Sequence, residues 1–167
     1  MNISRFICVG GILTTLAVFF QSAPIFLPAI GLCLSPLSTI PIAIATFSNI
    51  PLGLYVFFSS VLILTMISIQ ESIILLFTTG LLGIVIGTLL FRKGILISIL
   101  SSSIALSLGI TCLTYIVCIP SFVDLASSFS PALTFLIFLL FPLIYASICN
   151  IFIKKFINYI TKIKIIS

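Results

Sequence analysis

Long apolar runs separated by short polar or charged breaks dominate the chain. Five runs are easily bounded, at residues 6–22, 52–69, 72–91, 94–119 and 131–153. Each comes close to or exceeds the roughly 20 residues that a helix needs to cross a bilayer. The pattern therefore predicts at least five transmembrane helices.

A proline-rich stretch lies between the first two runs and reads QSAPIFLPAIGLCLSPLSTIPIAIATF. Residues 29–47 of it are apolar and long enough to form a sixth span, in which Pro36 and Pro41 each remove a backbone donor. In lipid the freed carbonyls need other partners, and we expect the hydroxyls of Ser35, Ser38 and Thr39 to help. This segment is predicted to be a proline-interrupted helix that faces the bundle interior, with a re-entrant loop as the alternative.

The basic residues give the orientation, because they collect at the cytoplasmic ends of spans. They form three groups: Arg5, the Arg92-Lys93 pair, and the lysines at 154, 155, 162 and 164. Two basic groups lie on the same side only if an even number of spans separates them. Two spans separate the Arg92-Lys93 pair from Lys154, but only three certain spans separate Arg5 from Arg92. A further span at 29–47 makes this number even and places all three groups on one side. We expect both termini in the cytoplasm, and Glu71 and Asp124 in outer loops.

Composition agrees with a membrane location. Hydrophobic residues make up 62% of the 167 residues and charged residues 5%, whereas a soluble domain carries about a quarter charged residues. We expect an all-α, polytopic transmembrane bundle, with residues 1–167 as one integral domain of the cell membrane. The first run is interpreted as an uncleaved span rather than a signal peptide. The net charge of +5 follows from membrane orientation, and nucleic-acid binding is not expected.

Catalytic chemistry is not expected. The chain has no His, only two acidic residues, and five dispersed Cys without a CxxC pair. Such a set cannot supply a nucleophile with its base, paired carboxylates or the usual metal ligands. There is also no phosphate-binding P-loop. We therefore expect no enzyme activity, no metal and no cofactor.

Small residues mark two helix-packing faces. Gly80, Gly83 and Gly87 share one face of the run at 72–91, and Gly10, Thr14 and Ala17 form a weaker pattern in the first run. Small residues at this spacing let helices approach closely. Packing within the chain is the favoured interpretation, and contact with another subunit is the alternative.

Candidate ligand-binding residues are Glu71 and Asp124, the only acids, and Ser103 and Ser107 of the serine-rich run at 94–119. A cationic or hydrogen-bonding molecule arriving from outside would meet the two acids first. The alternatives are that the acids are solvated loop residues and that the serines bond to carbonyls of their own helix. The basic tail at 154–167 is interpreted as a helix end that lies along anionic lipid of the inner leaflet.

The order of these features resembles a known family. Six short spans, the proline-rich stretch and the segments PLGLY and FTTGLLGIVIGTLLFRKG are similar to the substrate-binding S components of energy-coupling factor transporters, and to bacterial membrane proteins of the YybS type. The resemblance covers about residues 10–120.

The resemblance implies an S-component-like fold and a role in capturing a small, vitamin-like nutrient from outside. The ligand would sit in the outer half of helices four to six. A separate transmembrane coupling subunit and cytoplasmic ATPases would drive its release. The alternative is a scaffold subunit of a cell-envelope complex, similar to the rod-shape protein MreD, with a filled interior and an exposed apolar groove.

Overall fold

The computed structural model describes residues 3–119, 123, 127 and 130–166. Within these residues, five helical stretches are long and apolar enough to cross a bilayer: Ile3–Phe26, Ile50–Ile67, Ile69–Leu89, Ile95–Tyr115 and Leu133–Tyr159. The prediction of an all-α, multi-pass membrane protein is confirmed. The predicted sixth span at 29–47 has a different form, described below.

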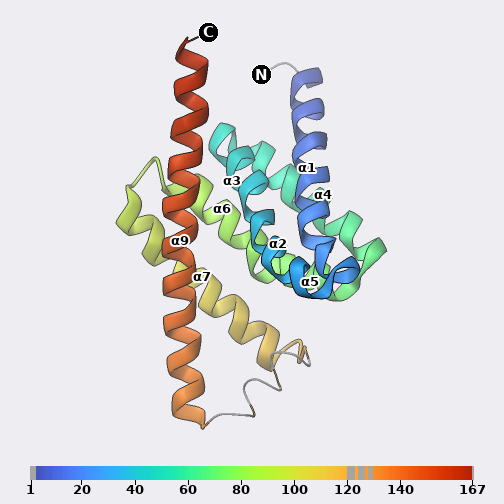
Figure 1. The fold of residues 1–167 in the computed structure, drawn as a ribbon, viewed down its shortest axis with the longest axis vertical. Coiled ribbons are helices and arrows are strands. Elements are labelled where there is room, and N and C mark those ends of the chain that lie inside the picture. The colour runs from blue at the N-terminus through green and yellow to red at the C-terminus, as the bar shows by residue number, and fades with distance from the viewer. Residues whose placement is uncertain (1–2, 120–122, 124–126, 128–129, 167) are drawn as a thin grey trace.

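The elements in chain order are α1 (Ile3–Phe26), α2 (Pro28–Leu34), η1 (Ser35–Ser38), α3 (Thr39–Ser48), α4 (Ile50–Ile67), α5 (Ile69–Phe77), α6 (Thr79–Leu89), α7 (Ile95–Tyr115) and α9 (Pro131–Ile166). Both termini lie at the same end of the molecule (Figure 1). Helices α1 to α6 form one half of the bundle. Helix α9 stands at the other side, where it packs mainly against α7.

The proline-rich segment turns back along α1 in three pieces, α2, η1 and α3, each of which contacts α1. Pro36 lies in the 3₁₀ turn η1, and Thr39 Oγ1 donates a hydrogen bond to its carbonyl at 2.8 Å. Pro41 does not interrupt the helix, contrary to the prediction, because it lies in the first turn of α3, where its missing N–H is no loss.

Two further breaks lie at Ser68 and Thr78. Ser68 has extended backbone angles (φ −156°, ψ 118°) and joins α4 to α5 in a tight reversal. Thr78 (φ −118°, ψ −89°) divides the predicted span at 72–91 into α5 and α6. Gly109 of α7 packs against this second break, and a Cβ there would overlap the carbonyl of Phe77. The absence of a side chain at Gly109 therefore lets α7 approach the interrupted backbone.

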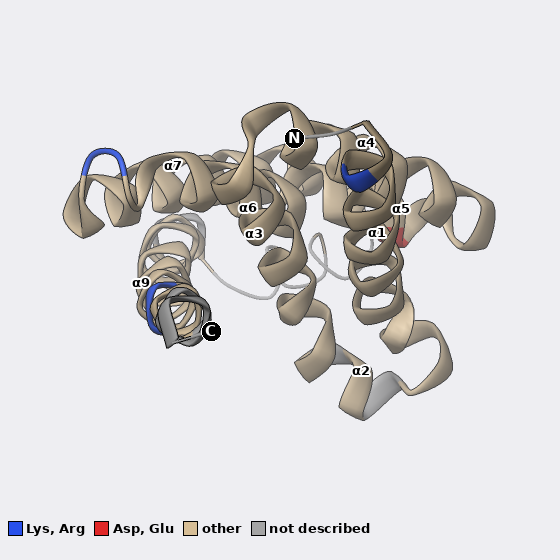
Figure 2. Cartoon of the chain, turned by 90° about the horizontal axis from the view of Figure 1, so that it is seen from above, with Lys and Arg blue, Asp and Glu red and all other residues tan. Residues whose placement is uncertain are grey.

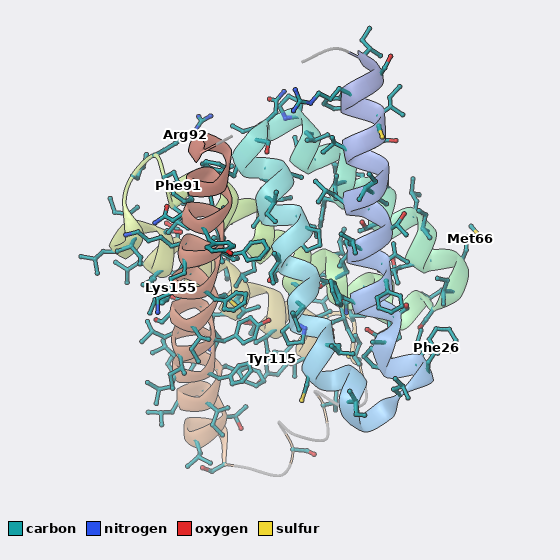
Figure 3. The ribbon with its side chains drawn as sticks, turned by 45° about the horizontal axis from the view of Figure 1, so that its top comes forward. Phe26, Met66, Phe91, Arg92, Tyr115 and Lys155 are labelled. Carbon is teal, nitrogen blue, oxygen red and sulfur yellow. The ribbon has the colours of Figure 1, made fainter. Side chains whose placement is uncertain are left out.

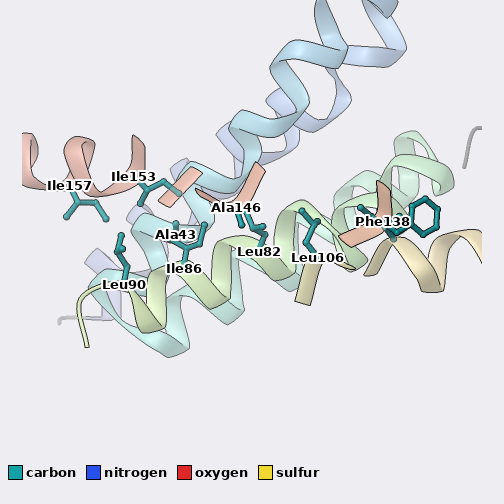
Figure 4. Close-up of a cluster of buried hydrophobic side chains, with 10 residues drawn as sticks. Ala43, Leu82, Ile86, Leu90, Leu106, Phe138, Ala146, Ile153 and Ile157 are labelled. Atoms are coloured by element: carbon teal, nitrogen blue, oxygen red, sulfur yellow. The ribbon is translucent and has the colours of Figure 1, made fainter. Parts of the chain in front are cut away.

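Two apolar clusters fill the interior of the described part of the chain. One joins α1, α3, α4 and α5, and the other joins α3, α6, α7 and α9 (Figure 4). Helix α3 belongs to both clusters and contacts α6 along its length. Gly83 and Gly87 make this contact possible, because Cβ atoms there would lie 3.0 Å from Ile42 and 2.6 Å from the carbonyl oxygen of Ala43. The broken segment is thus the centre of the packing.

The outer surface is covered with large apolar side chains. Met66 is 87% exposed, and Phe26 and Met66 point outward (Figure 3). Apolar exposure of this extent is rare on water-soluble monomers and fits contact with lipid. The described charged residues gather on the first turns of α1, in the turn between α6 and α7, on α9 and, for the acid, on α5 (Figure 2).

The basic tail does not turn away from the last span. Helix α9 runs without a break from Pro131 to Ile166 and includes Lys154 and Lys155 (Figure 1). The tail is thus a continuation of the last span, and its expected position along anionic lipid of the inner leaflet stays a prediction. No proline or glycine follows Pro142 in this helix, so nothing local ends it.

Candidate functional site

A buried amide side chain, that of Gln21, joins four elements of the bundle. Its Oε1 accepts hydrogen bonds from Ser38 Oγ of η1 at 2.8 Å and from Thr79 Oγ1 of α6 at 3.0 Å. Its Nε2 donates to Oε2 of Glu71 in α5 at 2.9 Å. Gln21 and Ser38 are completely buried, and Thr79 is nearly so. We call Gln21, Ser38, Glu71 and Thr79 the Gln21 cluster.

Interrupted helices place three of these four side chains. Ser38 ends η1, Thr79 begins α6 directly after the break at Thr78, and Glu71 is the third residue of α5. The backbone N–H of Glu71 donates to Ser68 Oγ at 3.4 Å, so the reversal at Ser68 also fixes the start of α5. Helix ends bring polar side chains inward here without leaving them unpaired.

Glu71 is the member of the cluster that meets the outside. Its side chain is half-buried, and its hydrogen bond within the described part of the chain uses Oε2. The lone pairs of Oε1 can therefore accept a hydrogen bond from a bound molecule. Helices α2 and α5 lie at the end of the α1–α6 half that is remote from both termini (Figure 1). The arrangement can bind a cation or a hydrogen-bond donor arriving from that end.

The prediction for Glu71 needs a correction. It was expected in a solvated outer loop, but it lies in the first turn of a helix and bonds to a residue 50 positions earlier in the chain. The reversal at Ser68 is so tight that no loop separates α4 from α5. A carboxylate in a membrane helix is costly, and such residues usually mark functional sites.

A second buried amide, Asn150 of α9, bonds to α7. Ser98 Oγ donates to Asn150 Oδ1 at 2.5 Å, and Asn150 Nδ2 donates to Ser102 Oγ at 3.1 Å and to the carbonyl of Ala146 at 2.8 Å. Asn150, Ser98 and Ser102 are all fully buried. This Asn150 cluster contains no ionisable group and holds two helices together.

The other predicted ligand residues do not join Glu71. Ser103 is buried, and its hydroxyl donates to the carbonyl of Leu100 in its own helix at 3.1 Å. Ser107 lines a separate cavity of about 200 Å³ between α7 and α9, together with Thr111, Tyr115, Thr134, Phe135, Phe138 and Leu139. Asp124 lies outside the described residues. Gln21 and Thr79 were not predicted as site residues. The sequence did offer one signal, because Gln21 is an amide within the apolar run at 6–22.

The two small-residue faces are packed inside the chain. A Cβ at Gly10 would lie 3.0 Å from the ring of Tyr55, and one at Gly80 would lie 2.5 Å from the ring of Phe57. Thr14 and Ala17 are buried on the same side of α1 as Gly10. Across the described part of the chain, no three His, Cys, Asp or Glu side chains come together as metal ligands.

Comparison with known proteins finds no matching family model and no significantly similar curated protein or solved structure.

Proposed function

We propose that the chain is the membrane-embedded subunit that captures a small solute for uptake and works with a separate coupling subunit and cytoplasmic ATPases. The observation that carries this proposal is the Glu71 carboxylate, held within the helical bundle at the end remote from both termini. With the basic clusters in the cytoplasm, that end faces outward. The broken segment α2–η1–α3 then supplies the second of six membrane crossings.

The Gln21 cluster suggests the chemistry of the solute. Gln21 already uses its oxygen for two hydroxyl donors and one N–H for Glu71. Gln21 and Ser38 are completely buried and Thr79 nearly so, which leaves the half-buried carboxylate of Glu71 to face a ligand. A carboxylate accepts hydrogen bonds, so we propose a small molecule that carries a cationic or hydrogen-bond-donating group. A hydrogen bond to a charged group is worth about 1.5–3 kcal/mol, which corresponds to roughly 10- to 100-fold in affinity.

Native mass spectrometry on protein purified gently from its own membranes tests the proposal. We expect a bound small molecule on the wild-type protein and at least a tenfold loss in Glu71→Gln, which keeps the size and removes the charge. Lys93→Gln, a charge change at the α6–α7 turn, is the matched control and should keep the molecule. A wild-type protein that carries neither a molecule nor transport subunits, or a Glu71→Gln variant that binds normally, would contradict the proposal.

A scaffold subunit is the second candidate, and a groove of about 420 Å³ between α1 and α4 favours it. Gly11, Thr15 and Ser59 are small residues that line part of this groove, and nothing lies within 4 Å of the place that a Cβ of Gly11 would occupy. Small residues on a lipid-facing groove suit the close approach of a partner's transmembrane helix. If the protein is a scaffold, Gly11→Ile should abolish binding of the partner, whereas Glu71→Gln should leave that binding unchanged.

A further inference from the structure

Two apolar hollows form one groove along α9. The first has a volume of about 280 Å³ and lies between α9 and the η1–α3 junction. The second has a volume of about 300 Å³ and lies between α9, α3 and α1. Leu37, Ile40 and Phe152 line both hollows, so the two adjoin each other along α9. We call them together the α9 groove.

The size of the α9 groove fits a hydrocarbon chain. Its lining on α9 extends from Tyr145 to Phe156, a length of about 16 Å at 1.5 Å per residue. Half of a bilayer's hydrocarbon core, which is the depth of one leaflet, is about 15 Å. A lipid acyl chain is therefore an occupant of matching length.

A basic side chain stands at the end of the groove near the termini. Lys155 follows Ile148, which lines the groove, by seven residues and therefore lies on the same face of α9. The next residue, Phe156, also lines the groove. The side chain of Lys155 is exposed, and α9 carries basic positions at this end (Figure 2).

We propose that the α9 groove is a binding site for one anionic phospholipid of the leaflet on the side of the termini. An acyl chain packs between Leu37, Ile40 and Phe152, and the long side chain of Lys155 extends toward the phosphate. The groove is apolar along its length, so the acyl chain supplies the contact area and Lys155 supplies the headgroup preference. This proposal does not depend on the proposed transport function.

Lipid retention by the purified full-length protein tests the site. The protein is mixed with phosphatidylglycerol and phosphatidylcholine of equal chain length, and bound lipids are counted by native mass spectrometry. We expect one phosphatidylglycerol per protein, retained about tenfold better than phosphatidylcholine. Equal retention of the two lipids would overturn the proposal.

Two variants distinguish the contribution of the lipid's acyl chain from that of its headgroup. Leu37→Trp fills the groove and should reduce retention of both lipids at least tenfold, whereas Leu108→Trp, at an exposed position of α7, should not. The variant Lys155→Gln should lose the preference for phosphatidylglycerol, and Lys93→Gln should keep it. Normal retention in Leu37→Trp, or an unchanged preference in Lys155→Gln, would contradict the site.

A measurement on the unmodified protein covers the case in which Leu37→Trp does not fold. Phosphatidylglycerol with a photoreactive diazirine in its acyl chain is crosslinked to the wild-type protein, and the attached peptides are sequenced. We expect attachment at Leu37, Ile40, Cys149 or Phe152. Attachment spread evenly over the exposed faces of α4 and α7 would show ordinary lipid contact and overturn the proposal.

Discussion

The two halves of the bundle each bury an amide side chain, but they do so in different surroundings. Gln21 lies among interrupted elements, where η1, α5 and α6 begin or end, and it holds a carboxylate. Asn150 lies between two continuous helices, and its partners are two serines. The ionisable side chain, that of Glu71, thus lies where helices are interrupted. In the continuous pair α7 and α9, the buried amide of Asn150 only joins the two helices.

The Gln21 cluster and the Asn150 cluster should therefore differ in how well they tolerate the loss of the amide side chain. The serines of the Asn150 cluster have carbonyls of their own helix within reach, and Ser102 already donates to Ser98 O at 2.7 Å. The carboxylate of Glu71 has no such local substitute, because it accepts hydrogen bonds and its donor comes from another helix. We therefore infer that the α1–α6 half depends on its polar contacts more than the α7–α9 pair does.

The largest effect is expected where the two halves meet, at Gly109. Gly109→Ala places a methyl group against the carbonyl of Phe77, and both sides of this contact are backbone. Because neither backbone segment can move aside without disturbing its helix, we expect the free energy of unfolding to fall by about 3 kcal/mol or more. Unfolding in mixed micelles of increasing SDS content measures this change.

The matched control for that substitution is Gly11→Ala, because a Cβ there meets nothing within 4 Å. Alanine is also the better helix former by about 1 kcal/mol. Gly11→Ala should therefore leave the stability unchanged or raise it slightly. Equal stability of the two alanine variants would mean that α7 does not depend on close packing at the break.

The next largest effect should distinguish the two amides directly. Gln21→Leu leaves the Glu71 carboxylate without its donor and two hydroxyls without their acceptor, so we expect a loss of about 2 kcal/mol in the free energy of unfolding. Asn150→Leu breaks two interhelical hydrogen bonds and should cost about 1.2 kcal/mol, because each such bond in a membrane is worth about 0.6 kcal/mol. The same SDS titration measures both, and equal losses would refute the contrast between the halves.

The smallest effect is expected at Ser103. Its hydroxyl bonds to the carbonyl of Leu100 in its own helix, so Ser103→Ala should change the free energy of unfolding by less than about 0.5 kcal/mol. Any bound solute should also be retained in native mass spectrometry. A marked loss of solute in Ser103→Ala would move the ligand site from Glu71 toward α7.

The sequence by itself determined the class of this protein. Apolar run length and the scarcity of charge predicted a multi-pass helical membrane protein, because a bilayer accepts few other structures. The prolines also marked where a helix would be interrupted, although Pro36 and Pro41 differ in effect: one lies in a 3₁₀ turn and the other in the first turn of a helix, where a proline is tolerated.

Only the tertiary structure decided which polar groups meet. Gln21 and Glu71 are 50 residues apart, and Gln21 and Thr79 are 58 apart, so no local pattern could pair them. The break at Thr78 was equally hidden, because no proline marks it and its stabilising neighbour, Gly109, lies on another helix. The apolar pattern of a sequence indicates which residues contact lipid or the protein interior. It does not indicate which helices are neighbours, and hydrogen bonds between helices depend on that packing.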